Sequence, residues 1–291
     1  RSTHTNTKTP LRDLLPSDLN YYWDTKTPTP SQLAQADTFF QPTPTSPTKL
    51  WTAAKFRTTP LNSDQPEVVF LGRSNVGKSS LLNAVMGKEI CWTSSKPGRT
   101  RVMNAFGITG PKAAGNRARI VLLDMPGYGK ASRPEWGVEI MKYLQGRRQL
   151  RRAFLLVDAL HGLKHTDQDI LRLFRQYAIP HQIVLAKVDR VLSKSRKQMK
   201  SGVSANNIAE LKRILYNLRP VVQPDGRVEG PGALGEILTC SAETEIGGGQ
   251  ALGVNALRWA ILASTGFGGS IEVKDEAIPS VSADSTASVP G

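Results

Sequence analysis

Short runs of apolar residues alternate along the chain with longer segments in which apolar residues recur every three or four positions. The runs at 68–71, 154–157 and 183–186 contain no polar residue, which is typical of strands covered on both faces. A further short run lies at 237–240. The longer segments with helical spacing are 166–177, 206–218 and 254–263. This alternation predicts an α/β fold with a doubly wound, mostly parallel sheet and helices on both faces.

The same pattern predicts three local features. Residues 105–109 and 120–124 are expected to pair as neighbouring strands, joined by the Gly- and Pro-containing insert 110–119. Thr166 is expected to cap the helix that follows it. The helix over 206–218 is expected to end before Pro220, because proline lacks the N–H that continues a helix.

Polar residues dominate both ends of the chain. Residues 1–48 are rich in Thr, Ser and Pro without a sustained apolar period, which predicts an extended or disordered N-terminal extension. Its apolar residues are candidate anchors onto a surface, namely Leu14, Tyr21, Tyr22, Trp23, Phe39 and Phe40. Residues 49–265 are expected to form the folded domain, and the Gly-, Ser- and Ala-rich residues 266–291 a disordered C-terminal tail.

The composition narrows the class of protein. No apolar stretch approaches the length of about twenty residues that spans a bilayer, so no membrane span is expected. Cys91 and Cys240 are too few for a disulfide framework, which favours a reducing compartment. The net charge of +14 favours a polyanionic partner such as nucleic acid. The alternative is that lysine and arginine only make the surface soluble.

The residues between the first buried run and the next helical segment match the phosphate-loop pattern G-x-x-x-x-G-K-[ST]. Glycines allow a tight turn in which backbone N–H groups converge on phosphate oxygens, and the helix that follows directs its unpaired N–H groups at the same point. Lys78 is expected to reach the β- and γ-phosphates, and the Ser79 hydroxyl to bind Mg²⁺. The predicted binding residues of this loop are Gly72, Arg73, Ser74, Asn75, Val76, Gly77, Lys78, Ser79 and Ser80.

Two further motifs fit the phosphate and metal end of a nucleotide site. Residues 124–127 end a predicted strand as D-x-x-G does, so Asp124 is expected to hold Mg²⁺ through water and the Gly127 N–H to bond the γ-phosphate. Thr100, which follows Gly98 and Arg99, is the candidate switch threonine on the metal. An ordinary loop threonine is the alternative. The predicted metal-binding set is therefore Ser79, Thr100 and Asp124.

Two motifs near the C-terminal half fit a guanine base. Residues 186–189 are similar to N/T-K-x-D, so Asp189 is expected to accept hydrogen bonds from the guanine ring N–H and amine, while the Lys187 stem packs on the base. Ser241 and Ala242 match the S-A element whose backbone N–H reads the guanine carbonyl. Each motif follows a predicted strand, and such sheets bind ligands at the carboxyl ends of their strands. The sequence therefore predicts a P-loop NTPase that binds GTP or GDP.

Over roughly residues 50–265 the chain resembles the EngB/YsxC-type ribosome-biogenesis GTPases, with the mitochondrial members the most similar. The resemblance is carried by the segments 72–80, 96–100, 124–129, 156–158 and 167–168. It implies a GTPase that assists maturation of the large ribosomal subunit, in the mitochondrial matrix or, alternatively, in chloroplast or cytoplasm. The implied partners are ribosomal RNA and proteins of an assembly intermediate, together with other assembly factors, and a monomer is expected off the ribosome. The basic, hydroxylated residues 1–12 are compatible with an organelle-targeting region.

The chain departs from its relatives at Ala186 and in its tails and the inserts 110–119 and 222–235, which are candidate partner contacts. It also lacks the water-orienting glutamine of small signalling GTPases. Ala186 stands where relatives carry Asn or Thr, so we expect nucleotide affinity to be weaker by about 1 kcal/mol. Tyr128 follows Gly127 in place of a water-orienting glutamine, so intrinsic hydrolysis should be slow. Asn75 matches the asparagine that binds K⁺ in related GTPases, with a loop-capping role as the alternative. The predicted catalytic residues are Lys78, Thr100, Gly127 and Asn75, and Arg99 or Arg101 is an alternative internal finger.

Two groups of basic residues are candidate contacts to ribosomal RNA, with a solvated helix face as the alternative. The groups are Lys142, Arg147, Arg148, Arg151 and Arg152, and Lys194, Arg196, Lys197, Lys200, Lys212 and Arg213. The main alternative function is a catalytically weak scaffold that uses these residues and the tails, and Ala186 and Tyr128 favour it. The residues that favour an enzyme are the intact Lys78, Ser79, Thr100 and Asp124. A metabolic P-loop kinase would need an acceptor site and a lid, which the sequence does not supply.

Overall fold

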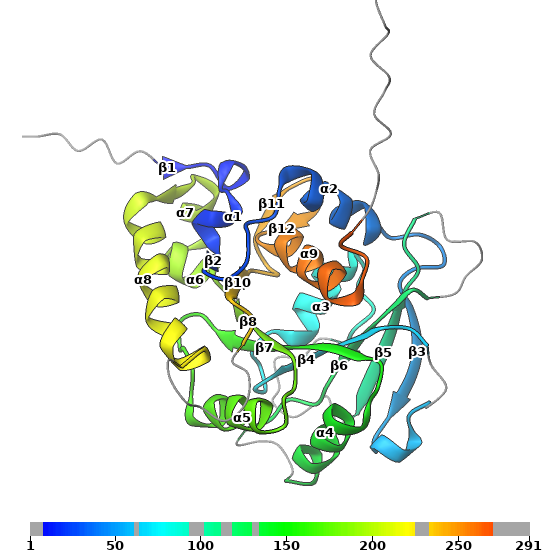
Figure 1. Ribbon diagram of the computed structural model, residues 1–291. Helices are drawn as coiled ribbons and strands as arrows, with labels where there is room; N and C mark the ends of the chain where they lie inside the picture. Colours follow the sequence, from blue (N-terminus) through cyan, green and yellow to red (C-terminus); the bar gives the residue numbers. More distant parts are fainter. Residues whose placement is uncertain are drawn as a thin grey trace, which may run out of the picture.

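The computed structural model describes residues 8–60, 64–92, 102–111, 118–129, 134–224 and 233–269. Within them lies an eight-stranded sheet of order β2-β10-β8-β7-β4-β6-β5-β3 (Figure 1). Five of its strands run parallel, namely β10 (Glu236–Cys240), β8 (His181–Ala186), β7 (Leu150–Asp158), β4 (Glu67–Gly72) and β6 (Ile120–Asp124). The antiparallel strands are β2 (Tyr21–Tyr22), β5 (Met103–Ile108) and β3 (Thr48–Ala53). The predicted mostly parallel sheet and the predicted pairing of β5 with β6 are confirmed.

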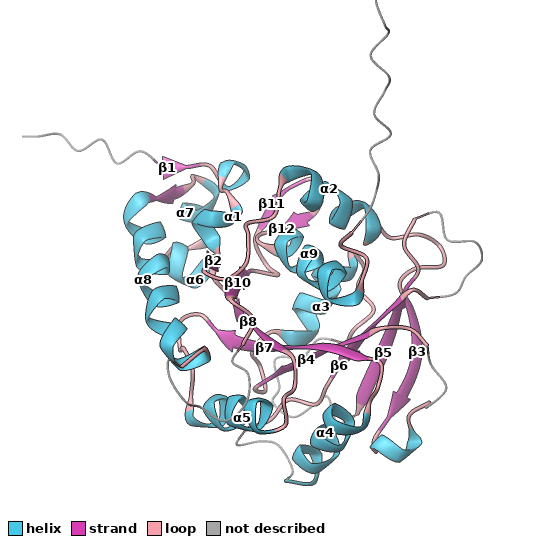
Figure 2. Ribbon diagram, viewed as in Figure 1, coloured by secondary structure: helices cyan, strands magenta, loops and turns pink. Residues whose placement is uncertain are grey.

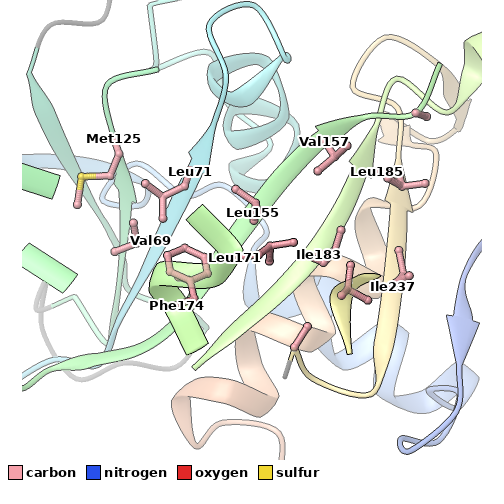
Figure 3. Packing of buried hydrophobic residues seen from close by; sticks show 14 of the residues in the cluster. Val69, Leu71, Met125, Leu155, Val157, Leu171, Phe174, Ile183, Leu185 and Ile237 are labelled. Atoms are coloured by element: carbon pink, nitrogen blue, oxygen red, sulfur yellow. The ribbon is translucent and has the colours of Figure 1, made fainter. Parts of the chain in front are cut away.

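Helices cover both faces of this sheet (Figure 2). Along β4, Val69 and Leu71 belong to the core on one face, and Val68 and Phe70 to the core on the other. The first core includes residues of α4 (Pro134–Gly146), α5 (His165–Gln176) and α8 (Ala205–Val222); in Figure 3, Leu171 and Phe174 of α5 lie against its strands. The second includes residues of α2 (Pro30–Phe39), α3 (Lys78–Met86) and α9 (Val254–Thr265). Because successive strand residues point to opposite faces, an unbroken apolar run serves both cores.

The prediction that the N-terminal extension is extended or disordered is wrong for residues 8–48. Thr29 caps α2: its side chain accepts a hydrogen bond from the N–H of Gln32 at 3.3 Å, and the Gln32 side chain accepts one from the N–H of Thr29 at 2.8 Å. Phe39 and Phe40 are buried, and α2 packs on α9. The Thr- and Pro-rich composition led to the wrong prediction, because in this segment Thr29 and Pro30 form the cap and first turn of a helix and not a flexible linker.

The extension also completes the sheet and a second, smaller one. Its strand β2 pairs with β10 and forms one edge of the large sheet, and β1 (Lys8–Thr9) pairs with β9 (Val203–Ser204). Before β2, buried Asn20 accepts a hydrogen bond from the backbone N–H of Thr239 at 2.8 Å. These contacts join residues far apart in sequence, so no local pattern predicted them.

Asn20→Ala is expected to lower the free energy of unfolding by about 1–3 kcal/mol, because the buried N–H of Thr239 would lose its acceptor. Urea unfolding of the full chain measures the change. Asn206→Ala is the matched control, since Asn206 is exposed on α8 and its replacement should change stability by less than about 0.5 kcal/mol. Equal effects of the two substitutions would contradict a structural role for Asn20.

Three helix and tail boundaries differ from those expected. Helix α8 continues through Pro220 to Val222, whose complete burial offsets the missing proline hydrogen bond. Thr166 is not a cap, since α5 begins at His165. Residues 266–269 of the predicted tail are described, and Phe267 packs on Phe39 with ring centroids 5.5 Å apart; residues 270–291 lie outside the described residues. Among the described helices, none has the length and apolarity to cross a membrane.

Candidate nucleotide-binding site

The phosphate-loop residues form a tight turn between β4 and α3, as predicted. Asn75 and Gly77 have left-handed backbones, with φ of 64° and 99°. A Cβ on Gly72 would lie 2.7 Å from the Val76 side chain and 3.0 Å from the Leu156 carbonyl oxygen, so only glycine fits there. Buried Ser74 Oγ has no hydrogen-bond partner among the described atoms. An unsatisfied buried hydroxyl in a loop that opens a helix suits a phosphate oxygen.

The structure brings two of the three predicted metal-binding residues together. Ser79 Oγ donates to Asp124 Oδ2 at 2.9 Å, and the Lys78 ammonium contacts the same carboxylate. Lys78 and Asp124 are both buried. A hydroxyl and a carboxylate are oxygen donors of the kind Mg²⁺ prefers, so this pair fits the ion. The third predicted residue, Thr100, lies outside the described residues with Gly98 and Arg99, and their roles stay predictions.

The loop after β6 lies directly on the phosphate loop at Gly127. A Cβ on Gly127 would lie 3.0 Å from the Ser74 backbone nitrogen and 3.0 Å from Ser74 Oγ. The Ser74 N–H donates to the Tyr128 carbonyl at 3.0 Å, and the Tyr128 N–H to the Gly72 carbonyl at 3.3 Å. The Gly127 backbone therefore lies beside the predicted phosphate site, where its predicted bond to the γ-phosphate requires it.

The predicted guanine-reading residues line one pocket with the phosphate loop and α3. Its lining includes Val76, Gly77, Ser80, Ala186, Lys187, Asp189, Ser241 and Ala242. Asp189 begins the short helix α6 (Asp189–Leu192), and Ser241 and Ala242 follow β10. Every predicted base contact therefore faces the same space, at the carboxyl edge of the sheet.

Lys187 joins the base pocket to the phosphate loop. Its ammonium donates to the Asn75 carbonyl at 2.6 Å and to Asp158 Oδ2 at 3.1 Å. Burial by itself raises the pKa of Asp158, but hydrogen bonds from His161 and Lys187 outweigh it and lower that pKa to about 2. The link supplies a connection between the two loops that the Ala186 side chain cannot make. Whether the substitution weakens nucleotide affinity stays a prediction.

Sequence reasoning assigned no role in the site to Asp167, a carboxylate that contacts two of its loops. It is fully buried at the start of α5, and its Oδ1 accepts a hydrogen bond from the Tyr128 hydroxyl at 2.7 Å. Its Oδ2 accepts one from the Lys164 N–H at 2.9 Å and lies 3.2 Å from Arg73 Nε. The pKa of Tyr128 is raised above its ordinary value, first by desolvation and then by this carboxylate. Asp167 thus joins α5 to both loops of the predicted phosphate site.

Comparison with known proteins gives matches over the region that holds these loops. Residues 67–187 match a family described as "50S ribosome-binding GTPase". The "Probable GTP-binding protein EngB" of Bartonella bacilliformis is 38% identical over 206 residues, covering 68% of this chain and 83% of that protein. The protein of the same name from Rhizobium meliloti is 46% identical over 134 residues, covering 43% and 61%.

Two matches from the comparison with solved structures have a similar fold. One is the crystal structure of a probable GTP-binding protein engB, 20% identical with a TM-score of 0.43, covering 68% of this chain and 98% of that one. The other is Aquifex aeolicus Era bound to GDP and AlF4⁻, 23% identical with a TM-score of 0.46, covering 68% and 56%.

Proposed function

This chain belongs to the EngB family of GTP-binding proteins, and we propose that it assists maturation of the mitochondrial large ribosomal subunit as a GTP-dependent switch. The observation that carries the proposal is the pocket that Asp189, Lys187 and Ser241 form with the phosphate loop. Such a pocket selects a guanine nucleotide and places its phosphates beside Lys78. The ribosomal partner and the organelle follow from the family resemblance and from the basic residues 1–12.

The chain's own residues divide the work between binding and sensing. The phosphate-loop N–H groups and Lys78 bind the phosphates, and Lys78 exchanges its contact with Asp124 for phosphate oxygens. Ser79 and Asp124 would hold Mg²⁺, which when bound neutralises charge on the phosphates. The Gly127 N–H donates a hydrogen bond to the γ-phosphate, so the loop that contains Gly127 loses this contact and is released once the phosphate leaves.

The rate of hydrolysis is expected to be slow without an activator. The Tyr128 hydroxyl donates a hydrogen bond to Asp167, so the Tyr128 side chain does not orient the attacking water as a glutamine would. We propose that Asn75 binds K⁺ beside the phosphates and that hydrolysis is therefore faster in potassium than in sodium. Single-turnover hydrolysis in each salt measures the difference, and equal rates would contradict the role of Asn75.

Gradient sedimentation of mitochondrial extract tests the ribosomal assignment. With a non-hydrolysable GTP analogue, the protein is expected to move with large-subunit particles, and with GDP to stay near the top. Lys78→Ala should abolish the analogue's effect, whereas Lys88→Ala, which changes an exposed lysine just after α3, should not. A protein that stays at the top under all conditions would contradict the assignment. If Lys78→Ala lost nucleotide binding but still sedimented with particles, the scaffold function would hold instead.

A further inference from the structure

A groove of about 580 Å³ lies next to the guanine pocket, and its lining includes residues of the amino-terminal strand β1 and of the helices α6 and α8. Its lining includes the exposed cations Lys8, Arg190 and Lys194, together with polar Ser193, Gln198 and Asn207. Lys8 is oriented by a 2.8 Å hydrogen bond from its ammonium to Ser201 Oγ. The pairing of β1 with β9 brings Lys8 of the N-terminal extension into this lining.

The positive charge of this groove is not neutralised within the described part of the chain. The lining cations Lys8, Arg190 and Lys194 are exposed and form no ion pair with the described residues. Lys197 and Lys200 do not line the groove, but they are exposed on α7 (Arg196–Lys200), the helix that supplies Gln198 to the lining. The acidic side chain in the lining, Glu210, accepts hydrogen bonds from Nε and Nη2 of Arg213 at 2.9 and 2.7 Å. The groove therefore has an excess of cations that an anionic ligand would neutralise.

Other predicted RNA-contacting residues are already engaged elsewhere. Arg147 is buried and forms two hydrogen bonds to Glu67. Arg152 donates to Gln182 at 2.9 Å, and Lys212 lies 3.6 Å from Asp18. Those three positions are thus poor candidates for RNA contact. The exposed remainder of the first group, Lys142, Arg148 and Arg151, lies on α4 and near the start of β7, at the end of the sheet opposite the nucleotide pocket.

We propose that this groove binds the phosphate backbone of RNA and couples that contact to the guanine pocket; the proposal rests on the proposed ribosomal function. None of the groove's lining residues is aromatic, so base stacking is not available and phosphate contacts must supply the affinity. Lysine and arginine without acidic partners provide such contacts, and serine, asparagine and glutamine add neutral donors. The recognition is expected to be independent of sequence.

The coupling follows from Arg190, which lines both the groove and the guanine pocket. It follows Asp189 on α6, the element that carries the predicted guanine contact. A phosphate bound at Arg190 therefore acts on the element that holds the base. Because linkage is reciprocal, RNA should change nucleotide affinity by the same factor by which nucleotide changes RNA affinity.

The test uses the full chain and a fluorescent RNA duplex of ~20 base pairs, followed by anisotropy over a series of KCl concentrations. The groove variant combines Lys8→Glu, Arg190→Glu and Lys194→Glu, the three cations of the lining. The control combines Lys142→Glu, Arg148→Glu and Arg151→Glu, with the same change of charge. The groove variant should bind RNA about tenfold more weakly or worse, with a salt slope reduced by about one for each phosphate that it no longer binds. The control should remain within about threefold of the wild type.

A second measurement addresses the coupling. RNA should change the release rate of a fluorescent GDP analogue from the wild type, and this change should disappear in Arg190→Ala. Equal loss of RNA binding in groove and control variants, no RNA binding by the wild type near physiological salt, or preferential binding of an acidic peptide such as polyglutamate would overturn the proposal. An unchanged RNA effect in Arg190→Ala would overturn the coupling.

Sedimentation separates this inference from the proposed function. If the groove variant still moves with large-subunit particles and still binds RNA, the groove assignment fails while the ribosomal function stands. If the wild type does not sediment with particles, the ribosomal function fails, whatever the RNA titration shows.

Discussion

Asp167→Ala is expected to lower the single-turnover rate of GTP hydrolysis by about ten- to a hundredfold. The substitution removes the acceptor of the Tyr128 hydroxyl and the partner of Arg73, so two loops of the phosphate site lose their common attachment to α5. A hydrogen bond to a charged group contributes about 1.5–3 kcal/mol, and about 1.4 kcal/mol corresponds to a tenfold change in rate. Rapid-quench measurement of hydrolysis checks this result.

Tyr128→Phe separates loop positioning from general stability, because it removes one hydrogen bond and leaves Arg73 and Lys164 on Asp167. It should weaken binding of a GTP analogue by about tenfold while GDP affinity stays within about twofold, since only the γ-phosphate requires the Gly127 loop. Asp169→Ala, two positions further on at a more exposed carboxylate of α5, is the control and should change neither affinity. A parallel loss of GDP and analogue affinity would show that Tyr128 acts through stability alone.

The second large effect is expected at the far end of the sheet, where Glu67 and Arg147 form a fully buried ion pair. Arg147 Nε and Nη2 donate to the two Glu67 carboxylate oxygens at 2.8 and 2.6 Å, and Tyr143 donates to the same carboxylate. Burial, and then the Glu67 charge, raises the pKa of Tyr143. Arg147→Met should lower the free energy of unfolding by about 3–5 kcal/mol, because it leaves a buried carboxylate without its counter-charge.

Urea unfolding of single and double variants tests the origin of this loss. Glu67→Leu combined with Arg147→Met should recover most of the stability, since replacing both charges removes the desolvation cost together with the attraction. Arg148→Met, at an exposed neighbour, is the matched control and should have little effect. A double variant no more stable than Arg147→Met alone would contradict the unpaired carboxylate as the cause of the loss.

Local patterns were sufficient for much of the nucleotide site. Gly72, Lys78 and Ser79 fall where a strand ends and a helix begins, and Asp124 and Asp189 lie at or just after strand ends. In a parallel sheet these strand ends meet at one edge, so the phosphate-loop motif and the motifs at 186–189 and 241–242 were predicted to share the pocket that they line, with Asp124 beside Ser79. The Thr100 motif lies outside the described residues. The prediction succeeded because each motif is short, and because the rule that unites them concerns strand direction rather than the details of packing.

The N-terminal extension shows how composition misleads. By composition alone, Thr29, Pro30 and Gln32 are typical of a flexible linker. In their actual order they form the cap and first turn of α2. The strand pairing of β2 with β10, and the bond from Thr239 to Asn20, join positions more than two hundred residues apart. No periodicity within a window of the chain contains that information.

The sequence by itself determined the strand and helix alternation, the phosphate loop and the candidate guanine contacts, because these depend on residues adjacent in the chain. Only the tertiary structure decided that Asp167 joins two phosphate-site loops, that Arg147 is buried against Glu67 rather than free for RNA, and that Lys8 reaches the groove beside Arg190. Burial and charge pairing depend on which distant segments pack together, and this packing is determined by the contacts of the whole fold and not by residues adjacent in the sequence.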